Sequence, residues 1–391
     1  MDQDISIIES LSRSHLQIHP ERHLSIKPLS QGASNKLYAI STSGPGDVEF
    51  EFPYIFRVTL PVEPFYKTAS EVATLDYIRK HTSVPVPKVI AYSSTADNEL
   101  GFEWILIEKV RGASLEVEWR KMNMEEKDRT TRAVARYVKQ LRDQCSFDVI
   151  GSLYFREDLL DRKVHTVPTA DDRFVIGPIV IALMFVGGRK PRLSRNLGPY
   201  SDDGEYVTAL TNVEVEDAKF LLPSKVRTQP NFYEHLMKEA PEVAEGLEAL
   251  EKAQETLFPS RPRPPRSFTL SHRDLSLSNI YVNRATHAVT GIVDWECTGT
   301  RPFWERRYPV FLEGREIKEK PEPLSSGKDD PARAECWEGW EKSVLKRSWD
   351  EELGNVDHGD DATDKVRLEW RRDLDWVENY VEKLMQNKES V

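Results

Sequence analysis

The chain has 391 residues, of which 39% are hydrophobic and 30% are charged, a balance that is typical of globular proteins and excludes an intrinsically disordered chain. Asp and Glu residues number 65 against 54 Lys and Arg residues, which gives a net charge of -11 at pH 7. An acidic chain is poorly suited to hold the phosphates of a nucleic acid, so we expect no nucleic-acid partner.

The sequence shows no signal for a membrane span or for export. Its most apolar run, Phe174–Val186, is interrupted by Gly177 and Pro178 and is too short to cross a bilayer. We expect this run, within the apolar tract 174–190, to be core. No secretory signal opens the chain, and the 3 cysteines form no CxxC pair. We therefore expect a cytoplasmic protein with neither a disulfide framework nor a membrane partner.

The first 110 residues combine a helix with a strand-rich region. Residues 1–23 form a predicted helical extension, because apolar residues recur there at helical spacing. Short apolar runs separated by Gly and Ser predict strands over 24–60. A helix is predicted over 67–81 and a strand over 102–110, so the region has the order β-β-β-α-β-β.

The remaining residues, 111–391, are predicted to be mostly helical. Helices are expected over 124–145 and 365–386, where apolar residues recur at helical spacing. One β-rich segment, 268–296, interrupts them. Residues 316–332 are rich in Lys, Glu, Pro and Ser and are expected to form a flexible excursion.

The β-rich segment carries the strongest chemical signal. His272 and Asp274 stand in the motif HxD, Asn279 follows five residues later, and Asp294 follows the next apolar strand. Phosphoryl transfer needs a carboxylate that orients the attacking hydroxyl, and oxygen ligands that hold Mg²⁺. Asp274 can fill the first role. Asn279 and Asp294 can fill the second if a hairpin returns the chain, while His272 completes the catalytic set by bracing the loop. The alternative is a structural loop, which the flanking strands disfavour.

This motif, with "TGIVDWE" after it, resembles the aminoglycoside phosphotransferase and choline-kinase branch of the protein-kinase-like fold. The phrases "FVIGP" and "GPYSDDGEY" resemble the fungal aminoglycoside-phosphotransferase-like group, and the likeness covers roughly residues 24–315. It implies a bilobed α+β fold. A small antiparallel β-sheet lobe with one helix, 24–110, would bind nucleotide. A larger, mainly helical lobe, 111–391, would bind substrate and carry the catalytic loop.

The resemblance also assigns a phosphate-binding region. The loop "SQGASNK" would cover the phosphates of ATP with Gly32, Ala33 and Ser34, although an ordinary hairpin turn explains the same composition. Arg57 stands where kinases carry a phosphate-contacting Lys, and Glu71 stands where its ion-pair partner is expected. A purely structural salt bridge is the alternative for this pair.

Further residues belong to the expected nucleotide site. The segment "WILIEKVRG" resembles the hinge between the lobes, where the carbonyl of Glu108 and the N–H of Val110 would meet the adenine. Three apolar residues could pack around the purine or could be plain core, namely Ile55, Leu106 and Ile292.

Three neighbours of the motif residues have ordinary explanations. Lys67 is a second basic candidate for phosphate contact, but we expect it to be solvated at the start of its helix. Trp295 and Glu296 are expected to be structural. The alternative for Glu296 is contact with a second metal or with a cationic substrate.

The resemblance implies an ATP-dependent phosphotransferase that uses Mg²⁺ and phosphorylates a hydroxyl of a small molecule, aminoglycoside-like or another metabolite. Two alternatives stay open. One is a catalytically weak nucleotide-binding pseudokinase or scaffold module, which the departure from Lys at Arg57 favours. The other is a protein kinase, which the replacement of DFG by "VDWE" and the lack of an APE segment disfavour. The sequence specifies neither the acceptor nor the choice between ATP and GTP, nor the oligomeric state.

Overall fold

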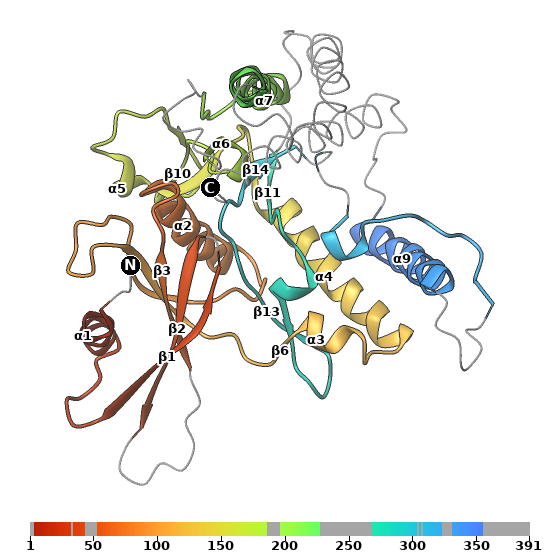
Figure 1. Cartoon of the computed structure of the whole chain (residues 1–391), viewed down its shortest axis with the longest axis horizontal. Helices are drawn as coiled ribbons and strands as arrows, with labels where there is room; N and C mark the ends of the chain where they lie inside the picture. Colours follow the sequence, from red (N-terminus) through yellow and green to blue (C-terminus); the bar gives the residue numbers. More distant parts are fainter. Residues whose placement is uncertain are drawn as a thin grey trace. The chain divides into compact units, whose positions relative to one another are not determined.

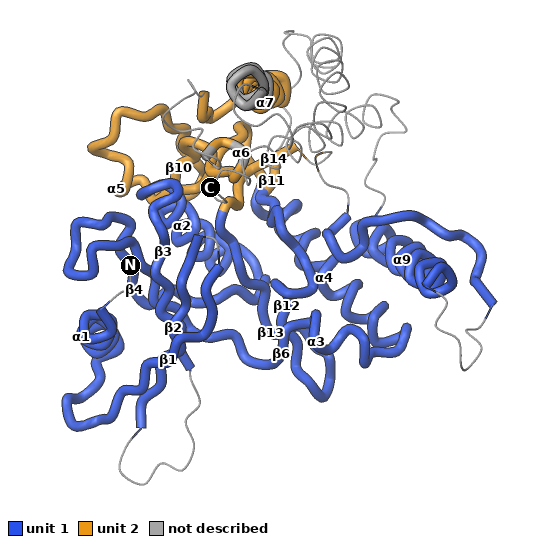
Figure 2. Tube along the Cα trace, in the orientation of Figure 1, with its two compact units in different colours: residues 1–145, 270–296, 307–356 blue, residues 146–269, 297–306, 357–391 orange. Residues whose placement is uncertain are grey.

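The chain folds into two compact units, each built from separate stretches of sequence. Unit 1 comprises residues 1–145, 270–296 and 307–356, and unit 2 comprises residues 146–269, 297–306 and 357–391 (Figure 2). The structure, a computed structural model, describes residues 4–32, 34–43, 53–185, 196–226, 268–302, 305, 308–322 and 331–354. The expected lobe boundary between residues 110 and 111 lies inside unit 1, and the division into lobes stays a prediction.

Unit 1 begins with an antiparallel sheet of 5 strands in the order β1-β2-β3-β5-β4 (Figure 1). Its strands are β1 (His23–Gln31), β2 (Asn35–Ser43), β3 (Tyr54–Thr59), β4 (Val89–Ser93) and β5 (Glu103–Glu108). One helix, α2 (Tyr66–His81), connects β3 to β4 and buries most of its residues. This order confirms the α+β class and the β-β-β-α-β-β region predicted from sequence.

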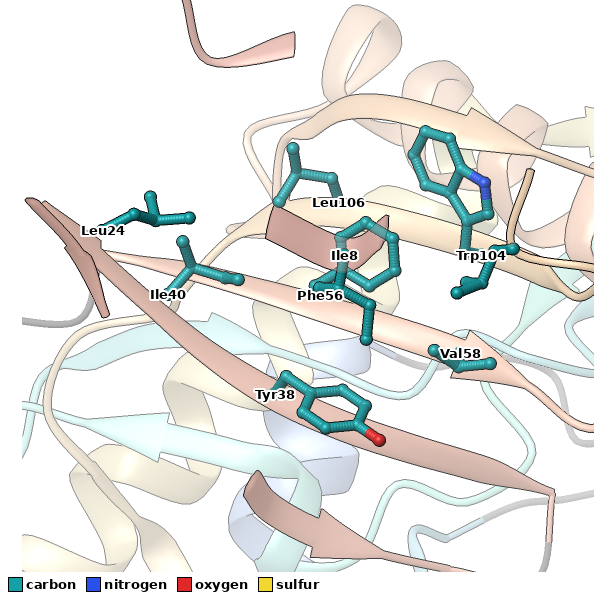
Figure 3. Packing of buried hydrophobic residues seen from close by; sticks show 9 residues of the cluster. Ile8, Leu24, Tyr38, Ile40, Phe56, Val58, Trp104 and Leu106 are labelled. Atoms are coloured by element: carbon teal, nitrogen blue, oxygen red, sulfur yellow. The ribbon is translucent and has the colours of Figure 1, made fainter. Parts of the chain in front are cut away.

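A hydrophobic cluster covers one face of this sheet beneath the helix α1 (Ile5–His15). Its nine buried members, shown in Figure 3, are Ile8, Leu24, Tyr38, Ile40, Phe56, Val58, Leu100, Trp104 and Leu106. Side chains of neighbouring strand residues point to opposite faces. Because Phe56 enters this cluster, Arg57 lies on the other face, where it bonds to a residue of α2. The helix expected within residues 1–23 is thereby confirmed, and it holds the outer face of the sheet.

The rest of unit 1 is a helical region with one hairpin. Its elements are β6 (Ala113–Ser114), α3 (Leu115–Trp119), α4 (Met124–Gln144), η2 (Leu277–Asn279), β12 (Ile280–Val282), β13 (Val289–Ile292), η4 (Val310–Leu312) and α9 (Pro331–Leu353). A capping box between Asn123 and Glu126 begins α4, as the helix predicted over 124–145 requires. Helix α9 packs along α4, and Nη2 of Arg132 in α4 lies 2.8 Å from Oε2 of Glu351 in α9.

Unit 2 contains strands that sequence reasoning missed. Its elements are β7 (Ser146–Phe147), β8 (Ser152–Phe155), α5 (Arg156–Leu159), β9 (Val167–Pro168), β10 (Phe174–Gly177), α6 (Ala182–Phe185), α7 (Asp203–Val226) and β14 (Gly299–Arg301), and β11 (Phe268–Ser271) crosses from unit 2 into unit 1. A sheet in the order β8-β10-β9 corrects the expectation of a single β-rich segment after residue 111. These strands have two to four residues, too few to show alternation in sequence.

Most of the described side chains in the apolar tract 174–190 are buried, although Ala182 is exposed. Phe174, Ile176, Ile181 and Met184 are each at most 1% exposed. The sequence expectation is therefore confirmed up to Met184, and the tract from residue 186 onward lies outside the described residues.

Two other expectations fall partly or wholly outside the described residues. These are the helix over 365–386 and residues 323–330 of the excursion predicted over 316–332. Of the helices that the structure describes, none has the length and the apolar character that a bilayer crossing requires.

The docking of α1 on the sheet predicts a large stability difference between two isoleucines of this helix. Ile8 is fully buried in the cluster, whereas the side chain of Ile5 is 47% exposed. Ile8→Ala should lower the free energy of unfolding by about 2–5 kcal/mol, because it leaves a cavity. Ile5→Ala, the matched control on the same helix, should change it by roughly 0.5 kcal/mol or less. Urea unfolding measures both, and equal effects would show that α1 does not carry this core.

Candidate active site

The loop after β11 holds Asp274 and Asn279 against each other. Asp274 is exposed, and Asn279 is buried at the end of the 3₁₀ helix η2. The amide nitrogen of Asn279 donates to the backbone carbonyl and to Oδ2 of Asp274, both at 2.9 Å. Because the amide nitrogen makes both bonds, the amide oxygen is the atom of Asn279 that could bind a metal.

The hairpin of β12 and β13 returns the chain to this loop, as the sequence suggested. The N–H of Val293 donates to the carbonyl of Asn279 at 2.9 Å. The buried ring of His272 bonds through Nε2 to the carbonyl of Val293, also at 2.9 Å. The rings of His272 and Trp295 meet in an edge-to-face arrangement, with ring centroids 4.6 Å apart. Asp294 therefore sits between Val293 and Trp295, and His272 of the catalytic loop contacts both of them.

Asp294 has an unusual backbone and an unusual electrostatic environment. Its φ of +66° lies in the left-handed region, which non-glycine residues adopt mainly at turns and functional sites. Asp294 is exposed, as Asp274 is, but protein atoms around its carboxylate reduce the hydration of the charge. The negative charges of Glu296 and Glu71 act in the same direction, and together these effects raise the pKa of Asp294 to about 7. Asp274 adds to the shift, so the two aspartates share one electrostatic site.

Arg57 and Glu71 form the ion pair whose positions the sequence singled out. Nη1 of Arg57 donates to Oε1 of Glu71 at 2.8 Å, and Nη2 donates to Oε2. Both side chains are buried. Within the described residues, Nε of Arg57 is a buried donor without a hydrogen-bond partner. The guanidinium thus keeps N–H groups that could bind a further anion.

Lys67 corrects a sequence expectation, because it is 1% exposed rather than solvated. Its Nζ lies 2.6 Å from Oε2 of Glu296 and 3.3 Å from Oδ1 of Asn35. Glu296 also accepts hydrogen bonds from Asn35 Nδ2 at 2.8 Å and from Ser34 Oγ at 3.1 Å. Burial opposes its ionisation, but the charges of Lys67 and Arg57 prevail and lower the pKa of Glu296 to about 2. In this structure, Glu296 pairs with the chain's own lysine.

The loop between β1 and β2 is described except for Ala33, which lies outside the described residues. The N–H of Gly32 donates to the carbonyl of Asn35 at 2.9 Å, which closes a tight turn. A Cβ at Gly32 would meet no atom within 4 Å. The fold itself therefore does not require glycine at this position. Ser34 reaches Glu296, so the loop contacts the segment that follows Asp294.

Residues 108–112 of the predicted hinge segment 104–112 border a cavity of about 460 Å³ together with Pro53 and Tyr54. The N–H of Glu108 donates to the carbonyl of Lys88 at 2.9 Å. The volume is in the range of small-molecule sites. Hydrogen bonding of the Glu108 carbonyl and the Val110 N–H to the adenine of a nucleotide stays a prediction.

One of the three apolar residues expected around a purine lies on the wrong face of the sheet. Leu106 belongs to the cluster beneath α1 and pairs with Phe56. Ile55 and Ile107 pair with each other on the face that carries Arg57. Counting in twos from Arg57 along β3 would have identified this face from the sequence.

No group of three or more His, Cys, Asp or Glu side chains that could cage a metal occurs among the described residues. Mg²⁺ does not need such a cage, because one or two protein oxygen ligands suffice when phosphates and water complete its shell. The role of Asn279 and Asp294 as ligands of this kind stays a prediction.

The burial of the Arg57–Glu71 ion pair predicts that removing one partner destabilises the protein more than replacing both. Glu71→Ala should lower the free energy of unfolding by about 3–5 kcal/mol, because it leaves the Arg57 charge buried without its partner. The double variant Arg57→Met with Glu71→Leu should recover most of that loss. Urea unfolding measures the cycle, and equal losses in the single and double variants would contradict it.

Gly112 at the end of the hinge predicts a second effect on stability. Its φ is +103°, and a Cβ there would lie 2.2 Å from the carbonyl oxygen of Val282. Gly112→Ala should therefore lower the melting temperature by several degrees or prevent folding. Gly32→Ala, where a Cβ meets open space, is the control and should leave the melting temperature nearly unchanged. A harmless Gly112→Ala would show that the hinge can shift away from Val282.

Comparison with known proteins identifies the family of this chain. Residues 25–306 match the phosphotransferase enzyme family. A subtelomeric hrmA-associated cluster protein of Aspergillus fumigatus is 30% identical over 327 residues, which cover 73% of this chain and 60% of the relative. The protein called altered inheritance of mitochondria protein 9, mitochondrial, of Clavispora lusitaniae is 25% identical over 363 residues, or 85% of this chain and 58% of the relative.

The chain therefore spans about three fifths of the length of these curated relatives. Among solved structures, the GDP and kanamycin complex of APH(2")-IIia aligns over 98% of both chains with 13% identity and a TM-score of 0.46. The family match extends from β1 to the end of the Asp294 segment and beyond, and covers well over half of the sequence. This chain belongs to the phosphotransferase enzyme family.

Proposed function

We propose that the chain transfers the γ-phosphoryl group of ATP to a hydroxyl group of a small molecule. The observation that carries the proposal is the convergence of Asp274, Asn279 and Asp294 in one unit, with the Arg57–Glu71 pair within electrostatic reach. Membership of the phosphotransferase enzyme family supports this class of reaction.

The residues at the centre fit a divalent cation. Asp294 carries a carboxylate whose ionisation its neighbours oppose, and Asn279 offers an amide oxygen next to Asp274. Crowded carboxylates of this kind favour a bound cation over a proton at neutral pH. When bound there, Mg²⁺ would neutralise charge on the phosphates of the nucleotide.

The acceptor hydroxyl would donate a hydrogen bond to Asp274, whose carboxylate orients it and takes its proton. The acceptor oxygen forms a bond to the γ-phosphorus while the bond to the β–γ bridging oxygen breaks, and ADP leaves with the electron pair. Asp274 is exposed, so an acceptor in solution can reach it. His272 and Asn279 keep the loop in place through their bonds to Val293 and Asp274.

The nucleotide would be bound by groups of the five-stranded sheet, α2 and their loops in the same unit. Arg57 would donate its remaining N–H groups to phosphate oxygens while Glu71 fixes the guanidinium. The loop of Gly32, Ala33 and Ser34 would cover the phosphates. The carbonyl of Glu108 and the N–H of Val110 would bind the base.

The proposed acceptor is a hydroxylated metabolite or an aminoglycoside-like molecule. The proposed setting is the cytoplasm, with neither a nucleic acid nor a membrane as partner. A nucleotide-binding scaffold without catalysis is the competing proposal, and the intact set of Asp274, Asn279 and Asp294 disfavours it.

Two substitutions at the centre should separate binding from chemistry. Asp294→Asn should abolish Mg²⁺-dependent binding of ATP, because it removes the charged ligand. Asp274→Asn should keep that binding and lower phosphoryl transfer by about 10²–10⁴-fold, because it removes the base. Calorimetric titration of ATP with and without Mg²⁺ measures the first effect. Screening of hydroxylated metabolites and aminoglycosides for phosphorylated product measures the second.

The outcomes distinguish the competing functions. Folded wild-type protein that binds no ATP in the presence of Mg²⁺ would contradict the proposal. Mg²⁺-dependent binding with ATP turnover that Asp274→Asn leaves unchanged would contradict the role of Asp274. Binding without transfer to any acceptor in the screen would favour the scaffold.

A further inference from the structure

Lys67 and Glu296 form an ion pair that the proposed reaction does not use. Nζ of Lys67 lies 2.6 Å from Oε2 of Glu296, and the lysine side chain is 1% exposed against 20% for the glutamate. Lysine is almost never fully buried unless it is paired. The start of a helix does not require a buried lysine, so helix formation alone does not explain why Lys67 is buried against Glu296.

Asn35 completes a closed set of bonds, which we call the clamp: Asn35, Lys67 and Glu296. Its amide nitrogen donates to Oε2 of Glu296 at 2.8 Å, and its amide oxygen accepts from Nζ of Lys67 at 3.3 Å. The clamp joins the start of β2, the first turn of α2 and the segment after Asp294. All three belong to unit 1.

The segment that the clamp holds has a costly backbone. Asp294 has φ +66° and Cys297 has φ +59°, and Glu296 lies between them. Left-handed conformations are unfavourable for non-glycine residues and persist only where the surroundings fix them. Before this turn, His272 and Asn279 bond to Val293. Within the turn, the side chain of Glu296 is bonded to α2 and β2.

We propose that Lys67 is a positioning residue for the metal-binding aspartate, acting through Glu296. The clamp fixes the turn 294–297 and thereby holds the carboxylate of Asp294 where Asn279 can share a cation with it. The inference rests on the proposed function, because it assigns Asp294 to Mg²⁺. Lys67 need not contact the nucleotide.

Two single variants separate positioning from simple electrostatics. Lys67→Met removes a positive charge near the site and Glu296→Gln removes a negative one, but both break the clamp. A purely electrostatic role predicts opposite effects on Mg²⁺ affinity, and a positioning role predicts the same effect. The measurement is calorimetric titration of ATP at a series of Mg²⁺ concentrations, which gives the Mg²⁺ concentration at half-maximal binding. Lys80→Met, at the exposed far end of α2, is the matched control.

If the clamp positions Asp294, both single variants raise the half-maximal Mg²⁺ concentration by about 10- to 100-fold, the usual cost of losing a residue that supports a metal ligand. The double variant should be no worse than either single variant, because each already breaks the same contact. Lys80→Met should match the wild type. Asn35→Ala breaks the clamp without leaving a buried charge, so it should shift the same concentration in the same direction even if Lys67→Met fails to fold.

Three results would overturn the inference. Tighter Mg²⁺ binding in Lys67→Met with weaker binding in Glu296→Gln would show that the pair acts through charge alone. If ATP binding measured in the absence of Mg²⁺ is lost in Lys67→Met and kept in the other variants, Lys67 is a phosphate ligand. If the folded variants bind ATP with the Mg²⁺ dependence of the wild type, the clamp does not position Asp294. Wild-type protein that binds no ATP at any Mg²⁺ concentration would instead overturn the proposed function and this inference with it.

Discussion

Charge balance is the constraint on which the site in unit 1 depends. The described side chains of the site supply four carboxylates and two buried cations, namely Glu71, Asp274, Asp294, Glu296, Arg57 and Lys67. Each cation is already matched, Arg57 by Glu71 and Lys67 by Glu296. The two aspartates take part in neither ion pair, although Arg57 also acts on Asp294, so carboxylates outnumber cations at the site. This excess of negative charge contributes to the raised pKa of Asp294 and underlies the proposal that a divalent cation binds there.

Sequence reasoning succeeded where the chemistry is local in the chain. Asp274 and Asn279 are five residues apart and bond directly, and the hairpin that follows is short enough to return Asp294 beside them. The Arg57–Glu71 pair was predicted from the resemblance to kinases, and the two side chains do bond to each other. Long periodic segments such as α2 and α4 were also predictable, since their apolar spacing extends over many residues.

The failures have a common physical origin in contacts between distant segments. Nothing near Lys67 in the sequence signals a carboxylate from the far side of Asp294, so a buried lysine looked like a solvated one. The strands of unit 2 have at most four residues and are defined by their partners rather than by their own pattern. The side of the sheet that Leu106 occupies, by contrast, was available from strand parity, and Leu106 follows the alternative of plain core.

The same long-range clamp constrains how the chain can fold during synthesis. Glu296 follows Asn35 by 261 residues, and unit 1 takes its last described helix from the stretch that ends at residue 353. At about 5–20 residues per second, the partner of Lys67 leaves the ribosome on the order of tens of seconds after α2. Until then the amino group of Lys67 must stay hydrated, so the first turn of α2 cannot adopt its final burial. The N-terminal sheet and α2 can therefore complete their packing around Lys67 only after most of the chain has been synthesised.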